Sequence, residues 1–142
     1  MRATVIGMLC VAVLVCGVTA EAASKKQARR ISEYCHICEA ASRISERLVR
    51  MLAKHPYESG LAAYAGKIAD VNADIFRKLG APAGAEKVKE HFGKAAAAFK
   101  RAVVLHKKAE YKASDEAGRE CLREFLLAVA EVRRLRKEGV IP

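Results

Sequence analysis

Apolar residues recur at helical intervals along the chain after Ser24. The stretch 26–54 carries a line of core positions with seven-residue spacing, Ile31, Cys38, Ser45 and Leu52, flanked by Tyr34, Ala41 and Leu48 on one side and widened by Ile37, Ile44 and Met51. This pattern predicts an amphipathic helix. The helix should stop at His55, because the residue before a proline is pushed out of the helical region.

Two further stretches show the same periodicity. The stretch 58–79 has an apolar face, and Gly80 and Pro82 follow it, which predicts a helix end with Gly80 as a left-handed cap. The stretch 83–111 keeps Val88, Phe92, Phe99 and His106 in register. We therefore expect a second and a third helix, joined by a short loop.

A fourth helix is expected after Ser114, a good N-cap residue. Cys121, Phe125 and Val132 lie on one line of it, and Gly139 predicts its end. Four amphipathic helices with short connections predict an all-α fold. We expect an up-down-up-down four-helix bundle that occupies residues 24–142.

The first 23 residues read as a signal peptide. Arg2 precedes an apolar run over 4–15, and residues 18–20 and 20–22 both fit the small-x-small rule for cleavage. The stretch 3–20 is just long enough to span a bilayer, so an uncleaved membrane anchor is the alternative. Cleavage predicts an exported protein, periplasmic or secreted.

The formal net charge is +10, but the basic residues are interleaved with acidic ones and the chain has no Trp. That arrangement argues against nucleic-acid binding and favours an anionic surface or an acidic protein partner. Four basic residues share one line of the first helix and predict a solvated basic face: Arg29, Arg43, Arg47 and Arg50. Whether the protein forms a homo-oligomer stays open.

Candidate chemistry concentrates in Cys35-His36-Ile37-Cys38, which places two thiols one helical turn apart. The pair could form a disulfide, hold a soft metal such as Cu or Zn, or simply pack in the core. A redox-active pair would need the helix to begin at Ser32, because a first-turn Cys35 has a lowered pKa. His36 lies on the basic line and is expected to be exposed.

A second candidate cluster combines His106 and Cys121 with Met51 and Tyr64. Simple bundle geometry turns His106 and Cys121 inward near one end of the bundle and places Met51 and Tyr64 at a similar level, where the four could ligate a metal or haem iron. The alternative is an interior histidine beside a buried cysteine. The same geometry separates Cys121 from Cys38 along the bundle axis.

The plan resembles small exported bundle cytochromes of the cytochrome b562 and cytochrome c-prime types in size, leader and helix count. The c-prime type requires Cys-x-x-Cys-His in its last helix, where this chain has only Cys121, and the b562 type requires a late histidine, whereas no histidine follows His106. No ligands are therefore carried over. Copper-storage bundles line their cores with many cysteines, and residues 24–142 have three.

No phosphate loop, di-iron motif or nucleophile–base pair indicates an enzyme. The leading hypothesis is an exported binding protein with a thiol-centred site at Cys35 and Cys38. One alternative is a structural or partner-binding bundle that uses its basic surface and only packs its cysteines. Another is a bundle cytochrome with non-standard haem ligation.

Overall fold

The computed structural model describes the backbone of residues 2–142 and the side chains of residues 24–142. Within that range it contains four helices and no strand: α1 (Arg2–Lys54), α2 (Ser59–Lys78), α3 (Glu86–Lys107) and α4 (Tyr111–Lys137). The expected all-α class with four helices is confirmed. The expected signal peptide, 1–23, lies outside the residues with described side chains.

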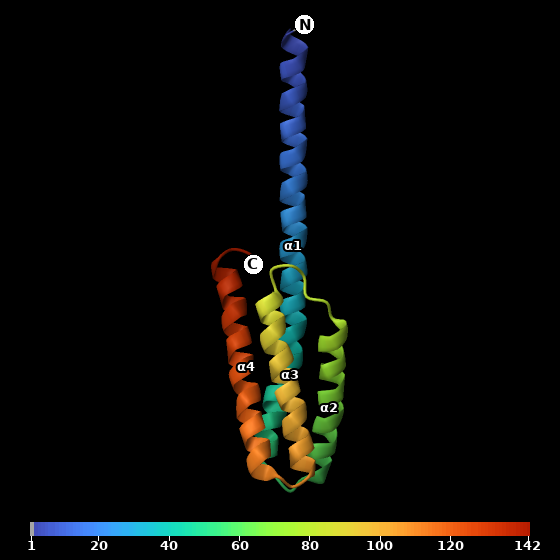
Figure 1. Cartoon of the computed structure of the whole chain (residues 1–142), viewed down its shortest axis with the longest axis vertical. Helices are drawn as coiled ribbons and strands as arrows, with labels where there is room; N and C mark the ends of the chain where they lie inside the picture. Colours follow the sequence, from blue (N-terminus) through green and yellow to red (C-terminus); the bar gives the residue numbers. More distant parts are fainter. Residues whose placement is uncertain (1) are drawn as a thin grey trace.

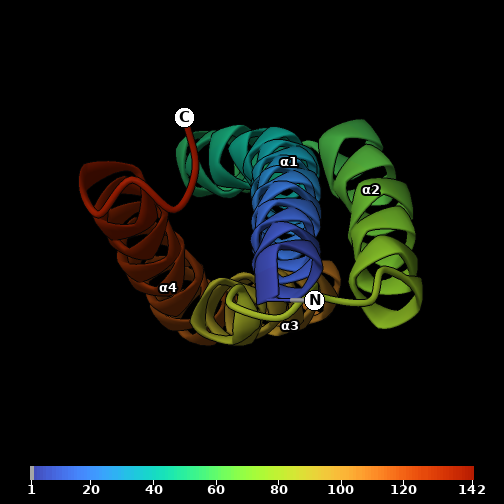
Figure 2. The same ribbon diagram turned by 90° about the horizontal axis from the view of Figure 1, so that it is seen from above.

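Successive helices run in opposite directions, and short loops connect them at the two ends of the bundle (Figure 1). Seen from above, α1 and α3 lie on opposite sides, with α2 and α4 between them (Figure 2). The tightest pairing is between α3 and α4, and α1 contacts each of the other three helices less extensively. The α1–α4 seam is therefore looser than the α3–α4 seam.

The turn between α3 and α4 corrects the expected helix ends. Ala109 adopts a left-handed conformation (φ 60°), so α3 already ends at Lys107 and α4 begins at Tyr111. Ser114 is consequently inside α4 and is not an N-cap. Its hydroxyl donates to the Ala102 carbonyl of α3 at 2.9 Å and ties the two helices together.

Of the other predicted helix ends, those of α1 and α4 are confirmed and the glycine cap of α2 is not. α1 stops at Lys54, before the His55-Pro56 pair, as expected. Gly80 does not adopt the left-handed conformation; Leu79 caps α2 in an extended conformation, and the positive φ of that loop is at Gly84 (92°). Gly139 (φ 71°) does end α4, where the Val140 amide donates to the Leu135 carbonyl at 2.9 Å.

The core is built around α3. Phe92 and Phe99 are its largest fully buried side chains, and Phe92 stacks on Phe76 of α2 and meets the ring of Phe125 of α4. Polar contacts add to the α3–α4 pairing: His91 Nδ1 lies 2.8 Å from Glu124 Oε2, and Arg101 pairs with Glu120. The tight pairing thus combines buried rings with ion pairs at its edges.

Small residues bring α1 close to its neighbours. On the α2 side, Asn72 Nδ2 donates to Ser45 Oγ at 2.7 Å and to the Ala41 carbonyl at 3.1 Å, in a buried seam. On the α4 side, Gly118 faces Val49, and a Cβ at Gly118 would lie 2.9 Å from Val49 Cγ1. Close approach at Gly118 therefore depends on the missing side chain.

We predict that Gly118→Ala lowers the free energy of unfolding by about 1–2 kcal/mol, because the stiff Val49 side chain must shift or α4 must move away. Gly93→Ala is the matched control, since nothing lies within 4 Å of its added Cβ. Helix propensity should make that control more stable by up to about 1 kcal/mol. Urea unfolding of both variants checks this, and equal stabilisation of the two would contradict the close contact.

Candidate functional site

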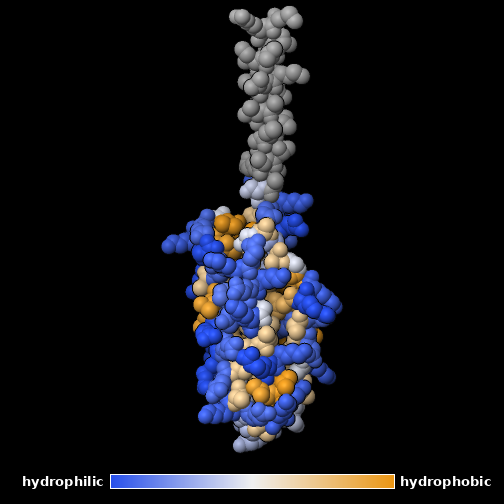
Figure 3. All heavy atoms as spheres, viewed as in Figure 1, coloured by the Kyte–Doolittle hydropathy of each residue, from blue (hydrophilic) through white to orange (hydrophobic). Residues whose placement is uncertain are grey.

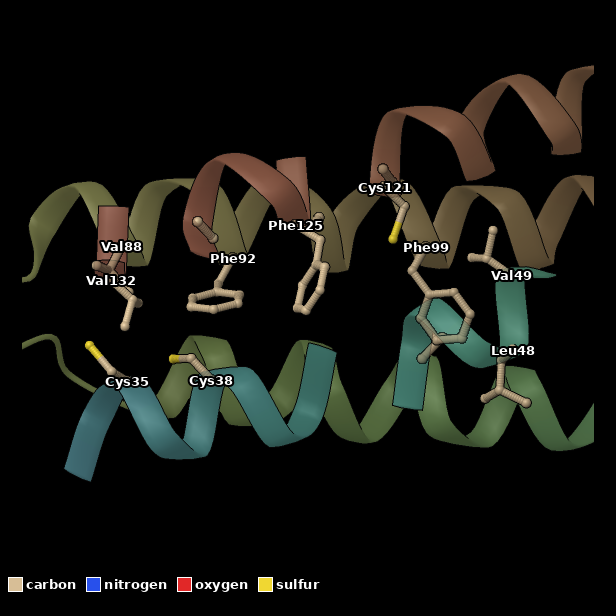
Figure 4. Close-up of a cluster of buried hydrophobic side chains, with 14 of the residues drawn as sticks. Cys35, Cys38, Leu48, Val49, Val88, Phe92, Phe99, Cys121, Phe125 and Val132 are labelled. Carbon is tan, nitrogen blue, oxygen red and sulfur yellow. The ribbon is translucent and has the colours of Figure 1, made fainter. Parts of the chain in front are cut away.

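Cys35 and Cys38 are buried on the face of α1 that points into the bundle. Cys35 lies opposite Val88 and Val132, and Cys38 lies opposite Phe92 (Figure 4). Both thiols are free. They occupy positions that a small apolar side chain would fill, surrounded by the core of α3 and α4.

The intervening His36 points the other way. Its side chain is 82% exposed, and its nearest carboxylate oxygen, from Glu39, is 3.9 Å away. The expectation of an exposed His36 is confirmed. The four-residue motif therefore contributes two sulfur atoms to the interior and no imidazole.

The environment of the pair disfavours the thiolate form. Burial raises the pKa of Cys35 to about 11, and the neighbouring Glu39 carboxylate adds to the shift. Burial also raises the pKa of Cys38 to about 12. The condition for a first-turn Cys35 with a lowered pKa is not met, because α1 continues through Ser32 and offers no free backbone amides there.

Tyr34 completes this part of α1. Its hydroxyl is buried without a well-aligned hydrogen-bond partner in the described part of the chain. Burial raises the pKa of Tyr34, and proximity to the Cys38 thiol raises it further. The surroundings of the two sulfurs are therefore those of a weakly polar core.

Cys121 lies on a separate level from the pair. It is buried beside Phe99, seven residues along α3 from Phe92 and hence about 10 Å further along the bundle (Figure 4). Burial raises its pKa to about 12. Among the residues with described side chains, no three His, Cys, Asp or Glu groups converge on a possible metal position.

The second candidate cluster does not assemble. Cys121 and His106 are buried, as expected, but Met51 is 46% and Tyr64 is 53% exposed, so these two side chains do not join them in the interior. The buried side of α2 is formed by small residues and Asn72 instead of Tyr64.

His106 packs against Tyr111 instead, with ring centroids 5.2 Å apart in an edge-on arrangement. Its Nε2 is buried and has no hydrogen-bond partner among the described residues. Tyr111 begins α4, ten residues before Cys121. His106 therefore belongs to the α3–α4 turn, about 15 Å along α4 from Cys121.

The predicted basic face is exposed along α1, and its four members differ in their pairing. Arg29 bonds Glu33 at 2.8 Å, and Arg50 bonds Glu46 at 2.9 Å. Arg43 and Arg47 are exposed, and neither forms an ion pair within the described side chains. The two arginines thus present charge that the bundle itself does not neutralise.

These arginines border a groove along the α1–α4 seam. Two adjoining clefts, of about 360 and 460 Å³, share Arg50. The first is lined by Val49, Leu52 and Leu122, and the second by Phe125, Leu126 and Val129 with Arg43, Arg47 and Arg133 at its edge. The groove has an apolar floor and a basic rim.

Sequence reasoning identified one side of this groove and missed the other. The arginines of α1 form a recognisable line in the sequence. Leu126 and Arg133 become part of the groove only because α4 packs beside α1. Leu126 is 66% exposed, although it is a large apolar residue. The spacing of Leu122, Leu126 and Val129 is the signal that could have indicated a second apolar stripe.

The α3 side of the bundle looks different. On that surface hydrophilic side chains surround a band of moderately apolar ones (Figure 3). Along the α1–α4 seam, by comparison, arginines lie beside the apolar lining of both clefts.

No protein-family model matches the chain, and neither a curated protein nor a solved structure matches it. Over the residues with described side chains, the helices contain no segment that is long and apolar enough to span a membrane. The geometry of the groove and of the thiols is therefore the basis for any functional assignment.

We predict that Cys35, Cys38 and Cys121 are all reduced and protected in the native protein. A thiol reagent at neutral pH should modify them only after denaturation, because burial keeps the thiols protonated and inaccessible. Peptide mass spectrometry of protein purified without reductant checks this. A mass loss that links Cys35 to Cys38 would contradict it and support the disulfide hypothesis.

We further predict that the protein loses stability as the pH rises above about 9. Unfolded thiols titrate near their ordinary pKa of 9.0, whereas the folded thiols hold their protons to about 11 or 12. The unfolded state therefore binds fewer protons in this window, and each thiol steepens the fall by up to about 1.4 kcal/mol per pH unit.

Cys38→Ala tests this prediction, because it should remove one thiol's share of the slope. Ile31→Val, a buried change without an ionisable group, should keep the wild-type slope despite its lower stability. Chemical unfolding at several values of pH measures both slopes. Equal slopes in the two variants would show that Cys38 does not carry the effect.

Proposed function

We propose that this protein is an exported, non-enzymatic helical bundle that binds an anionic partner through its basic surface. In this proposal residues 1–23 are a cleaved signal peptide, and residues 24–142 form an up-down-up-down bundle. One observation carries it: Arg43, Arg47 and Arg133 edge an apolar groove and, within the described side chains, have no carboxylate partner.

Electrostatics supports this proposal. Removal of residues 1–23 takes away one arginine and one glutamate, so the net charge stays at +10. Arginines without intramolecular partners keep their full charge available to an incoming anion, and such charges accelerate encounter and give salt-dependent affinity. An acidic partner or an anionic surface supplies the complementary charge.

The buried thiols also support partner binding as the function. A redox-active or metal-binding thiol site needs accessible or deprotonated sulfur, whereas all three thiols are buried and burial raises the pKa of each. We therefore assign Cys35 and Cys38 to the core. This choice favours the partner-binding alternative over a disulfide, a Cu or Zn site, or an unusual haem site.

We predict that the double variant Arg43→Glu with Arg47→Glu weakens binding to polyglutamate about tenfold or more in low salt. Reversal of two charges at the binding surface replaces attraction with repulsion. Fluorescence anisotropy with labelled polyglutamate measures the affinity, and circular dichroism checks the fold. Binding of the wild type should fall as salt rises.

The matched control is Lys67→Glu with Lys89→Glu, which changes the net charge equally on exposed positions of α2 and α3. It should keep most of the affinity. An equal loss in both double variants would show that net charge alone is responsible and would overturn the assignment to the α1 surface.

A further inference from the structure

The groove along α1 and α4 has a floor suited to an apolar stripe. Leu122, Leu126 and Val129 follow one another at helical spacing along α4, and all three line the clefts. Leu126 is 66% exposed in the absence of any occupant. A ligand that covers these side chains would remove apolar surface from water, at about 25 cal/mol per Å².

The rim of the groove carries positive charge on both banks. Arg43 and Arg47 line the α1 bank beside the Arg50–Glu46 pair, and Arg119 and Arg133 line the α4 bank. The acidic residues in the groove do not cancel this charge. Glu46 is held by Arg50, Glu39 is buried beside Arg136, and Asp115 lies at the far end of α4.

The length of the groove suits a helix of four to five turns. On α4 its lining extends from Ser114 to Arg133, and on α1 it extends from Glu39 to Lys54. At about 1.5 Å per residue these stretches span roughly 22–28 Å, the length of a helix of about 15–19 residues. An occupant of that length would contact both clefts at once.

The shape of the groove selects among anionic partners. A flat membrane surface would meet the arginines and the exposed Leu126 but would not follow the two clefts that extend along the seam. A single acyl chain could cover the leucines but would place its one charged group at one end, whereas the arginines occur along both banks. A rod with a central apolar stripe and acids on both flanks complements all of these features.

We infer that the α1–α4 groove binds an amphipathic α-helix whose apolar stripe is flanked by acidic residues, and which completes the bundle as an additional helix. The inference rests on the proposed function and names the class of its partner. Leu126 is the apolar anchor of this site, and Arg43 and Arg133 from opposite banks pair with the acids of the incoming helix.

The test uses two labelled 18-residue peptides of identical composition. One arranges leucines as a helical stripe with glutamates on both flanks, and the other is its scramble. We expect the purified protein to bind the patterned peptide at least about tenfold more tightly than the scramble, because only the first can pair stripe with floor and acids with both banks.

The matched variants are Leu126→Ser and Val71→Ser. Both replace an exposed apolar side chain (66% and 54% exposed), but Val71 lies on α2, away from the groove. Leu126→Ser should weaken binding of the patterned peptide about five- to tenfold, whereas Val71→Ser should leave binding of both the patterned peptide and polyglutamate unchanged. Circular dichroism confirms that both variants are folded.

The outcomes separate the inference from the proposed function. If the peptides bind equally, or if Leu126→Ser has no effect while Arg43→Glu with Arg47→Glu still abolishes polyglutamate binding, the surface binds anions but the groove does not accept a helix. Binding of anionic phosphatidylglycerol vesicles that depends on Leu126, without binding of the patterned peptide, would assign the groove to lipid and overturn the inference. If the wild-type protein binds neither polyglutamate nor the patterned peptide, both the inference and the proposed function are overturned.

Discussion

The buried face of α3 is the constraint on which the rest of the bundle depends. Phe92 and Phe99 fill the centre and contact side chains from the other helices, so each neighbour is positioned by these rings. Bonds such as His91 to Glu124 then hold α4 along α3. Because α4 packs most closely against α3, its contact with α1 is less extensive. The groove lies along this less extensive α1–α4 contact.

The same packing determines what the cysteines can do. A thiol that faces Phe92 or Val88 gains van der Waals contacts and loses the water that would stabilise its anion. Glu39 beside the pair makes a negative sulfur still less favourable. Reactivity and burial therefore oppose one another at Cys35 and Cys38, and the bundle favours burial.

Much of the fold could be predicted from the sequence, since helical periodicity locates the four helices of the described residues, and His55-Pro56 and Gly139 locate two of their ends. The turn at Ala109 could not, because a non-glycine residue in a left-handed conformation has no clear sequence signal. Because of that turn, α4 begins before Ser114, and the Ser114 hydroxyl binds α3 instead of capping α4.

For the site, a helical wheel was enough to predict that His36 and the arginines of α1 are exposed. It could not show that Met51 faces outward or that Leu126 lies beside Arg43, since both depend on how neighbouring helices pack.

The bond from Asn72 to Ser45 has a consequence for the uniqueness of the fold. Apolar and alanine-rich faces can slide past one another by a helical turn at small cost, because one methyl group resembles the next. A slip of α2 by four residues would bring Ile68 or Phe76 to the place of Asn72, leave the Ser45 hydroxyl without its amide donor and bury an unpaired amide elsewhere. One polar side chain in an otherwise permissive seam thus makes a single alignment of α1 and α2 favourable and the shifted alignments costly.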